Sequence, residues 1–342
     1  MRAISLLEPG KFEWTELAEA PSPGPGQVLV RIHTVGICGT DLHAFRGRQP
    51  FFSYPRILGH ELAVEVLEVG ADVAHLQPGD RCAVNPYLHC GHCIACRRGK
   101  TNCCVQLKVL GVHTDGGMRE RMILPAAHLY SSAKLSYAEL ALIETLGIGC
   151  HAVNRADPKA NIDRALVIGA GPIGSTVMEF LRLRGVPFEV LDLSEQRRAF
   201  ATEYMSAAAV HSSSAAILEG TPELPTVVFD CTGNPASMQQ AFHLTAAGGK
   251  LVFVGLFVGD ISFHDPDPFH RRELTILSSR NAVPAEHRDI LAHVEAGRVQ
   301  TKHWVSEECA VEGMMDRFPV WTDPGSGILK AVVRFESAGG AA

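Results

Sequence analysis

Long hydrophobic runs and an excess of charge are both missing from this sequence. No apolar stretch approaches the roughly 18 residues needed to cross a bilayer, and the opening segment, MRAISLLEPGKFEW, lacks the apolar centre of a secretory signal peptide. The formal net charge of the 342 residues is only −6, which argues against a nucleic-acid binder. We therefore expect a cytoplasmic protein without a membrane or nucleic-acid partner.

Cysteine, by contrast, is plentiful, with ten residues. Without a secretion signal, these cysteines are expected to be reduced thiols or metal ligands rather than disulfides. Four of them follow the spacing C-x2-C-x2-C-x7-C, namely Cys90, Cys93, Cys96 and Cys104. This spacing predicts the closed four-thiolate set of a structural zinc. An iron–sulfur cluster is the alternative, but no redox partner motif accompanies it. Cys103 breaks the spacing and is expected to be a partly buried thiol.

The segment GICGTDLHAFRGRQPFFSYPRILGHE, residues 36–61, carries a second set of metal-binding groups. Cys38 offers a thiolate, His60 an imidazole and Glu61 a carboxylate, which is the mixed ligand chemistry of a catalytic zinc with one open position. Thr40 and His43 lie between them and could pass a proton to water. Taken alone, each residue has a simpler interpretation, a buried cysteine in a turn and a hydrogen-bonded histidine.

The length of the chain predicts two domains. In the first, short apolar runs separated by turn residues predict strands of a barrel-like β domain, over Ala3–Leu7, Gln27–Val35, Val64–Val69 and Arg81–Val84. A helical pattern follows over Ser136–Val153 and contains Glu144 among apolar neighbours. This glutamate is either a charge on the helix surface or an inward metal ligand, and the spacing does not decide between them.

A dinucleotide-binding fingerprint begins after Ala165. The apolar strand in ALVIGAGPIGS runs into a glycine-rich turn that opens a helix, and a second strand, Phe188–Leu193, carries Asp192 near its end. The turn residues expected to approach a pyrophosphate at the helix N-terminus are Gly169, Gly171, Pro172, Ile173 and Gly174. Asp192 would bind the ribose hydroxyls and repel a 2′-phosphate, which favours NAD. The nearby Arg197 leaves some tolerance for NADP, and a helix cap is the alternative role of Asp192.

Strands and helices continue to alternate after this point, which predicts a doubly wound parallel sheet. The last strand, Leu329–Phe335, resembles the opening half of the chain and is expected to return to it. We therefore expect a mainly β catalytic domain over 1–147 and 283–342, with a zinc lobe at about 88–106, and an NAD-binding domain over 148–282.

Together these motifs resemble the zinc-dependent medium-chain dehydrogenase/reductase family over essentially the whole chain. The resemblance rests on GICGTD at 36–41, GHE at 59–61, the four-cysteine lobe and GAGPIG at 169–174. It is stronger to the polyol branch, which includes sorbitol and threonine dehydrogenases. Three further segments, at 49–61, 111–117 and 278–284, are similar to bacterial sugar-acid dehydrogenases of the L-galactonate and L-gulonate 5-dehydrogenase type. The family fold is a GroES-like catalytic domain joined to a Rossmann domain.

The resemblance implies roles for the metal-binding residues. Cys38 and His60 would hold a catalytic zinc, with Glu61 as a neighbouring or exchanging ligand. Glu144 matches the glutamate that reaches the metal in the polyol branch, directly or through water. The residue after that glutamate is usually proline in the branch and is Thr145 here, which puts direct ligation by Glu144 in doubt.

The remaining implied roles concern proton transfer and assembly. Asp41 would orient His60 from the second coordination sphere, while Thr40 and His43 match the proton relay of the family. The resemblance further implies two zinc ions per chain, NAD as the cofactor, and a homotetramer or homodimer formed through the edge strand of the nucleotide domain.

The expected reaction is the oxidation of a secondary hydroxyl to a ketone by NAD, with a sugar acid as substrate. Cationic residues near the expected pocket would bind its carboxylate, the candidates being Arg46, Arg48, Arg56, Arg280 and His113. Each of these arginines could instead be a solvated surface residue. A neutral polyol such as sorbitol or galactitol, or L-threonine, is the alternative substrate. A non-catalytic NAD-binding sensor is a more distant alternative, and it would have no need of the Thr40–His43 relay.

Overall fold

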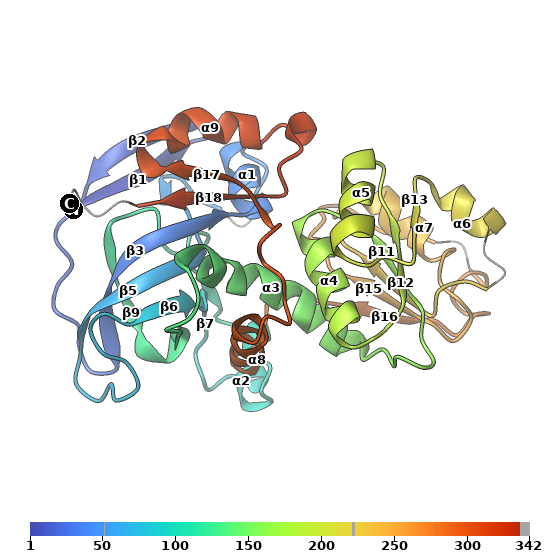
Figure 1. The fold of residues 1–342 in the computed structure, drawn as a ribbon, viewed down its shortest axis with the longest axis horizontal. Coiled ribbons are helices and arrows are strands. Elements are labelled where there is room, and N and C mark those ends of the chain that lie inside the picture. The colour runs from blue at the N-terminus through green and yellow to red at the C-terminus, as the bar shows by residue number, and fades with distance from the viewer. Residues whose placement is uncertain (51, 221–222, 264, 336–342) are drawn as a thin grey trace. The chain divides into compact units, whose positions relative to one another are not determined.

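The computed structural model describes residues 1–335 except 51, 221–222 and 264. The chain divides into two compact units (Figure 1). Unit 1 comprises Met1–Glu144 and Val283–Ala342, and unit 2 comprises Thr145–Ala282. No helix in the described part of the chain is long and apolar enough to cross a membrane.

Unit 1 is built mainly from β-strands. Its strands are β1 (Arg2–Glu8), β2 (Lys11–Glu16), β3 (Gln27–Ile37), β4 (Arg56–Ile57), β5 (Glu61–Val69), β6 (Arg81–Val84), β7 (Tyr87–Leu88), β8 (Lys108–Val109), β9 (Arg121–Pro125), β10 (Leu129–Ser131), β17 (Val305–Ala310) and β18 (Lys330–Arg334). Its helices are α1 (Gly39–Phe45), α2 (Ile94–Arg97), α8 (Pro284–Glu295) and α9 (Met314–Trp321). Helix α3 (Tyr137–Ala156) begins in unit 1 and ends in unit 2.

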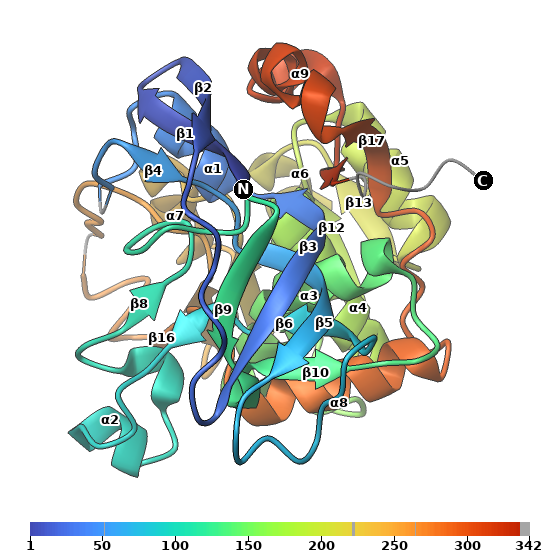
Figure 2. The same ribbon diagram turned by 90° about the vertical axis from the view of Figure 1, so that its left-hand side faces the viewer.

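A seven-stranded sheet organises unit 1. Its strands follow the order β10-β6-β5-β3-β18-β17, and β9 pairs with β3; Figure 2 shows β9, β3, β5, β6 and β10 side by side. Burial alternates along the first part of β3, because one face of an antiparallel sheet meets the core and the other meets water. Strand β18 pairs antiparallel with β3, which confirms that the last strand returns to the opening half of the chain.

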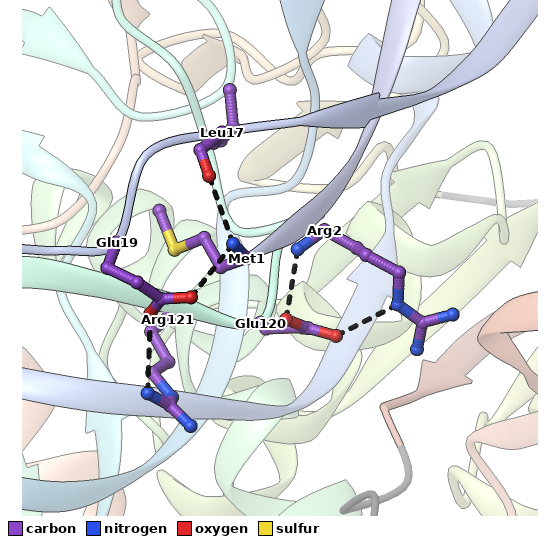
Figure 3. Close-up of polar contacts among 6 residues, drawn as sticks. All are labelled: Met1, Arg2, Leu17, Glu19, Glu120 and Arg121. Carbon is purple, nitrogen blue, oxygen red and sulfur yellow. Dashed lines mark hydrogen bonds and ion pairs between the residues drawn. The ribbon is translucent and has the colours of Figure 1, made fainter.

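Polar contacts fasten the first residues of unit 1 to this framework (Figure 3). The amino group of Met1 donates to the carbonyl of Leu17 at 3.0 Å and pairs with Glu19 at the same distance. Arg2 bonds Glu120 through both its backbone amide and its guanidinium. Strand β1 is the middle strand of a small sheet with the order β2-β1-β4, and these contacts tie its start to the segment that leads into β9.

Unit 2 is a parallel sheet with helices packed against it. Its strands are β11 (Ala165–Ile168), β12 (Phe188–Leu191), β13 (Ala209–His211), β14 (Val227–Asp230), β15 (Lys250–Phe253) and β16 (Thr275–Ser278), in the order β13-β12-β11-β14-β15-β16. Its helices besides α3 are α4 (Pro172–Leu183), α5 (Glu195–Tyr204), α6 (Ser214–Gly220) and α7 (Pro235–Ala241). Every residue of β11 and β14 is buried, as expected when helices cover both faces of a parallel sheet. The doubly wound sheet predicted from the sequence is confirmed.

Candidate metal centres and dinucleotide site

The first metal-binding cluster is the four-cysteine lobe of unit 1. Its sulfur atoms all lie within 4.8 Å of one another and belong to Cys90, Cys93, Cys96 and Cys104. Helix α2 begins after Cys93, and the backbone amide of Cys96 donates to Cys93 Sγ at 3.5 Å. This amide lowers the pKa of the Cys93 thiol to about 6, which favours the thiolate that a metal requires. Cys103 is exposed, so the expectation that it is partly buried was wrong.

The second cluster brings together the groups predicted from residues 36–61. One ligand atom each from Cys38, His60 and Glu61 lies within 4.8 Å of the other two. Cys38 stands at the N-cap of α1, directly after β3, and Glu61 opens β5. Because β3 pairs with β5, with Gly36 opposite Glu61, the sheet register places the thiol beside the imidazole and the carboxylate.

Asp41 supports this cluster from within α1. It is buried, and its carboxylate accepts from the amide of Cys38 at 2.9 Å and from that of Gly59 at 3.4 Å. Its Oδ1 lies 3.7 Å from Nδ1 of His60. Burial alone would lower the pKa of His60, but Asp41, with help from Cys38, raises it well above its ordinary value. Asp41 therefore lies beside the imidazole, and the orienting role that the resemblance implies for it stays a prediction.

Glu144 approaches the same centre from α3. The side chain is buried, close enough for its charge to act on His60, but it lies outside the cluster in which all ligand atoms are within 4.8 Å. The phenol of Tyr87 donates a short hydrogen bond to its carboxylate. Burial raises the pKa of Glu144 and, together with that carboxylate, raises the pKa of Tyr87 well above its ordinary value. Glu144 therefore points inward and is not a surface charge of the helix.

Lys330 is a buried cation beside Glu61. Its Nζ lies 2.6 Å from Oε1 and 2.8 Å from Oε2 of Glu61, and it also donates to the carbonyl of Ile37 at 3.3 Å. The two side chains are 2% and 1% exposed. Burial alone would lower the pKa of Lys330, but the charge of Glu61 raises it. The lysine is thus a positive charge fixed at the edge of the metal-binding cluster.

The donor chemistry of this centre fits a divalent metal ion. A thiol, an imidazole and two buried carboxylates converge, and a further buried carboxylate, Asp41, lies behind the imidazole. One buried lysine offsets only part of the negative charge that these groups carry when ionised. Buried charges of this kind are stable when they are paired or coordinate a metal, and the S, N and O donors are those that zinc accepts.

The predicted proton relay lies on α1. Thr40 is half-buried at the second residue of the helix, and His43 follows one turn later. Partial burial, together with the charges of Arg46 and Arg48, lowers the pKa of His43. A neutral imidazole near solvent can accept a proton and release it.

The predicted dinucleotide turn has the required backbone in unit 2. Gly169 has φ +89°, and a Cβ at Gly174 would lie 1.8 Å from the carbonyl oxygen of Gly169, so only glycine fits there. Pro172 and Ile173 form the first turn of α4, with Gly171 as its N-cap. The glycines therefore let a pyrophosphate approach the backbone at the helix N-terminus closely, and the guanidinium of Arg197 lies near Gly171.

Asp192 and Arg197 lie beside this turn, as predicted. Asp192 accepts from the amides of Ala170 at 2.7 Å and Ser194 at 2.8 Å. Nη1 of Arg197 lies 3.9 Å from Oδ2 of Asp192. Asp192 and Arg197 therefore form a loose ion pair. These are the two side chains expected to distinguish the ribose of NAD from the 2′-phosphate of NADP.

The residues predicted to bind a substrate carboxylate differ in whether they already bond other groups of the protein. Arg46 donates to the carbonyl of Thr322, and Arg56 pairs with Asp115 at 3.2 Å. His113 accepts from the amide of Val109, and Arg280 has a partner of its own. Arg48 is exposed, and its side chain has no ion pair or hydrogen bond with another residue in the described part of the chain.

Sequence reasoning missed Tyr87 and Lys330. The signal for Lys330 was a lysine inside the apolar run ILKAVVRF, because such a run is typical of a strand that is buried on both faces. The signal for Tyr87 was weaker, because NPY before the four-cysteine lobe is an ordinary turn sequence. Neither partner could be assigned without knowing which distant segments lie together in the fold.

Comparison with known proteins agrees with this geometry. Residues 24–134 match the alcohol dehydrogenase GroES-like domain and residues 172–296 match the zinc-binding dehydrogenase domain. The chain is 39% identical to L-galactonate-5-dehydrogenase of Escherichia coli K12, over 87% of this chain and 88% of that protein. It is 35% identical to D-altritol 5-dehydrogenase of Agrobacterium fabrum, over 82% and 84%.

The solved structures give the same result for the fold. The short chain alcohol dehydrogenase RspB of E. coli CFT073, solved in complex with NADH, superposes with a TM-score of 0.90 at 28% identity, over 98% of this chain and 99% of that one. The GroES-like and Rossmann architecture expected from the motifs is therefore confirmed. The chain belongs to the zinc-dependent medium-chain dehydrogenase/reductase family.

Proposed function

We propose that this protein is a zinc- and NAD-dependent dehydrogenase that oxidises a secondary hydroxyl of a sugar acid to the ketone, of the L-galactonate/L-gulonate 5-dehydrogenase type. The observation that carries the proposal is the convergence of Cys38, His60 and Glu61 within 4.8 Å, with Glu144 facing them. Identity of 39% to an L-galactonate-5-dehydrogenase supports the sugar-acid substrate.

The metal ligands in this proposal are Cys38 and His60, with Glu61 and Glu144 as the available carboxylates. A zinc ion bound there would supply the Lewis acid that lowers the pKa of a substrate hydroxyl, and bound NAD would be the hydride acceptor. Asp41 holds the ring of His60 in one orientation, as outer carboxylates do for metal-binding histidines. The four cysteines of the lobe hold the second, structural zinc.

Proton transfer is the task of the residues on α1. Thr40 would accept the proton of the substrate hydroxyl at Oγ1 and pass its own proton toward the imidazole of His43. The lowered pKa of His43 keeps the ring neutral, so that it can take up this proton and release it to water. Thr40 and His43 therefore share one function. Replacing either residue is expected to lower the activity of the enzyme to a similar extent.

A neutral polyol is the second candidate substrate, since the chain is also 35% identical to D-altritol 5-dehydrogenase. The metal and cofactor residues serve both reactions, so only the substrate pocket distinguishes them. The test is a screen of NAD reduction with L-galactonate, L-gulonate, galactitol, sorbitol and L-threonine at equal concentration. The proposal predicts the highest kcat/KM for an aldonate, and it is wrong if a polyol or threonine turns over as fast as every aldonate.

A further inference from the structure

The residue that follows Glu144 is a buried threonine with an unpaired hydroxyl. Thr145 is 1% exposed, and its Oγ1 has no hydrogen-bond partner in the described part of the chain. A threonine inside a helix commonly bonds a carbonyl three or four residues back. Thr176 in α4 does so with Ile173 at 2.6 Å, whereas Thr145 in α3 does not. Because a buried hydroxyl without a partner is costly, Thr145 is expected to have a partner outside the polypeptide.

Helices α3 and α4 lie side by side in unit 2 and run in the same direction. A Cβ at Gly149 of α3 would lie 2.4 Å from Oγ1 of Thr176, so the two helices touch there without an intervening side chain. Further along, the guanidinium of Arg184 at the end of α4 bonds Asn154 at 2.5 Å and Asp157 at 3.1 Å. Residue numbers therefore rise together along the contact, which makes the helices parallel.

This register places Thr145 beside the dinucleotide turn. Thr145 lies one helical turn before Gly149, on the same face of α3. In α4, Pro172 lies one turn before Thr176. Thr145 is therefore level with Pro172, the first residue of α4, where a pyrophosphate is expected. Neither Pro172 nor Ile173 carries a polar side-chain atom, so the first turn of α4 offers the hydroxyl no partner.

The position of Thr145 along α3 indicates which part of a dinucleotide it meets. Glu144, the residue before it, is buried close enough to His60 for its charge to act on the imidazole. Hydride transfer requires the nicotinamide to reach the carbon whose oxygen the metal holds. The nicotinamide half of the cofactor therefore has to extend from the turn at Pro172 toward Glu144, and Thr145 is next to both.

We propose that the hydroxyl of Thr145 hydrogen-bonds the nicotinamide nucleoside of bound NAD, so that the cofactor supplies the partner that the protein lacks. This role rests on the proposed function, because it takes NAD as the cofactor. Proline, which usually follows this glutamate in the polyol branch, has no hydroxyl, so the bond is a property of this chain rather than of the branch. The competing interpretation is that an ordered water pairs with the hydroxyl and that Thr145 only packs α3 against α4.

The test compares the wild type, Thr145→Val and Thr145→Ser. Valine keeps the shape of the side chain without the hydroxyl, and serine keeps the hydroxyl. Calorimetry on the purified proteins, without substrate, gives the dissociation constants of NADH and of ADP. ADP carries the diphosphate but no nicotinamide nucleoside. The Tm of each protein is measured in the absence of any nucleotide.

Thr145→Val should bind NADH about tenfold more weakly than the wild type, which is about 1.4 kcal/mol, with unchanged affinity for ADP. Thr145→Ser should stay close to the wild type. The Tm of Thr145→Val should be unchanged or higher, because replacing an unpaired buried hydroxyl by a methyl group breaks no bond within the protein. Unchanged affinity of Thr145→Val for NADH would overturn the proposal, and so would an equal loss of affinity for NADH and ADP.

Thr245→Val is the matched control. Thr245 is also a fully buried threonine of unit 2, but its hydroxyl bonds the carbonyl of Ala241 at 2.8 Å. Its replacement should lower Tm and leave the affinity for NADH unchanged. If Thr145→Val does not fold, Thr145→Ala removes the same hydroxyl and should show the same loss of affinity for NADH alone. Failure of the proposed function would appear differently, because the wild type would then bind no NADH.

Discussion

The two metal-binding regions of unit 1 are assembled in opposite ways. The four-cysteine lobe is made by one short segment, in which α2 and the neighbouring turns bring four sulfurs within 4.8 Å. The Cys38 centre collects side chains from the N-cap of α1, the start of β5, the middle of α3 and the start of β18. A spacing rule is sufficient for the first region, whereas the second exists only when the whole sheet has formed.

This difference predicts different consequences of losing one ligand. Cys38→Ser should reduce kcat/KM at least about a thousandfold, because the Lewis acid contributes several kcal/mol to the transition state. The fold should remain, since the sheet does not depend on that thiolate. Elemental analysis should give about one zinc per chain in place of two, with an unchanged circular dichroism spectrum.

The matched change in the lobe is Cys93→Ser. It should also leave about one zinc, but the main effect should be on stability, with Tm lower by about 10 °C, because a structural zinc stabilises its lobe by several kcal/mol. Thermal unfolding followed with and without added zinc measures this. A Cys93→Ser protein with unchanged Tm, or iron in place of zinc in the wild type, would contradict the division between a structural and a catalytic site.

A smaller effect is expected within the assembled centre. Thr40→Val removes the hydroxyl of the relay but keeps the shape of the side chain, so kcat should fall about a hundredfold with little change in KM. Thr40→Ser retains a hydroxyl at the same place and should stay close to the wild type. Steady-state kinetics of the wild type and the two variants measure these kcat values. Equal kcat values for Thr40→Val and Thr40→Ser would show that Thr40 transfers no proton.

The same contrast explains how much could be predicted from the sequence. The lobe and the turn at Gly169 are local patterns, so their residues were identified before the structure. Cys38 and His60 are predicted as metal ligands from their donor chemistry, and the family resemblance of their motifs supports this prediction. The partners Tyr87 and Lys330 were not predicted, because each depends on a pairing between distant segments. The pairing of β18 with β3 brings Lys330 next to Glu61. Without this pairing, Lys330 is only an unexplained charge in an apolar strand.

Glu144 lies between the residues that local sequence patterns identify and those that only the fold identifies. Its helical spacing left a surface charge and an inward ligand equally open, and the structure shows it buried against Tyr87. Packing decides between the two, because burial beside Tyr87 of β7 is a contact between segments that are far apart in the sequence. Sequence periodicity describes a helix face but does not identify what the face meets.

The dinucleotide turn allows a test on a locally encoded site. Asp192→Ser should lower the preference for NAD over NADP, measured as the ratio of the two kcat/KM values, by about thirtyfold, which is about 2 kcal/mol. The physical reason is repulsion between the carboxylate and a 2′-phosphate, which Arg197 offsets only from 3.9 Å. Asp157→Ser, at an exposed acid of the same unit, is the control, and a wild-type ratio near one would refute the argument.

The smallest expected effect concerns the substrate carboxylate. We expect it to be bound by a side chain that has no other partner in the fold. Arg48 is that side chain among the arginines of unit 1 predicted for this role, since Arg46 and Arg56 already bond other groups. A charged hydrogen bond contributes about 1.5–3 kcal/mol, so an aldonate should exceed the matching alditol in kcat/KM by about tenfold or more.

Arg48→Ala should erase this difference and spare the activity toward the alditol, because the alditol presents no carboxylate to be bound. Arg46→Ala is the matched control, since it removes a guanidinium that is already tied to Thr322, and the aldonate preference should survive it. The ratio of kcat/KM for L-gulonate to that for the corresponding alditol measures this preference in both variants. If the two variants lose the preference equally, the two arginines act as a general positive field; if neither does, carboxylate recognition lies elsewhere and Arg48 is a solvated surface residue.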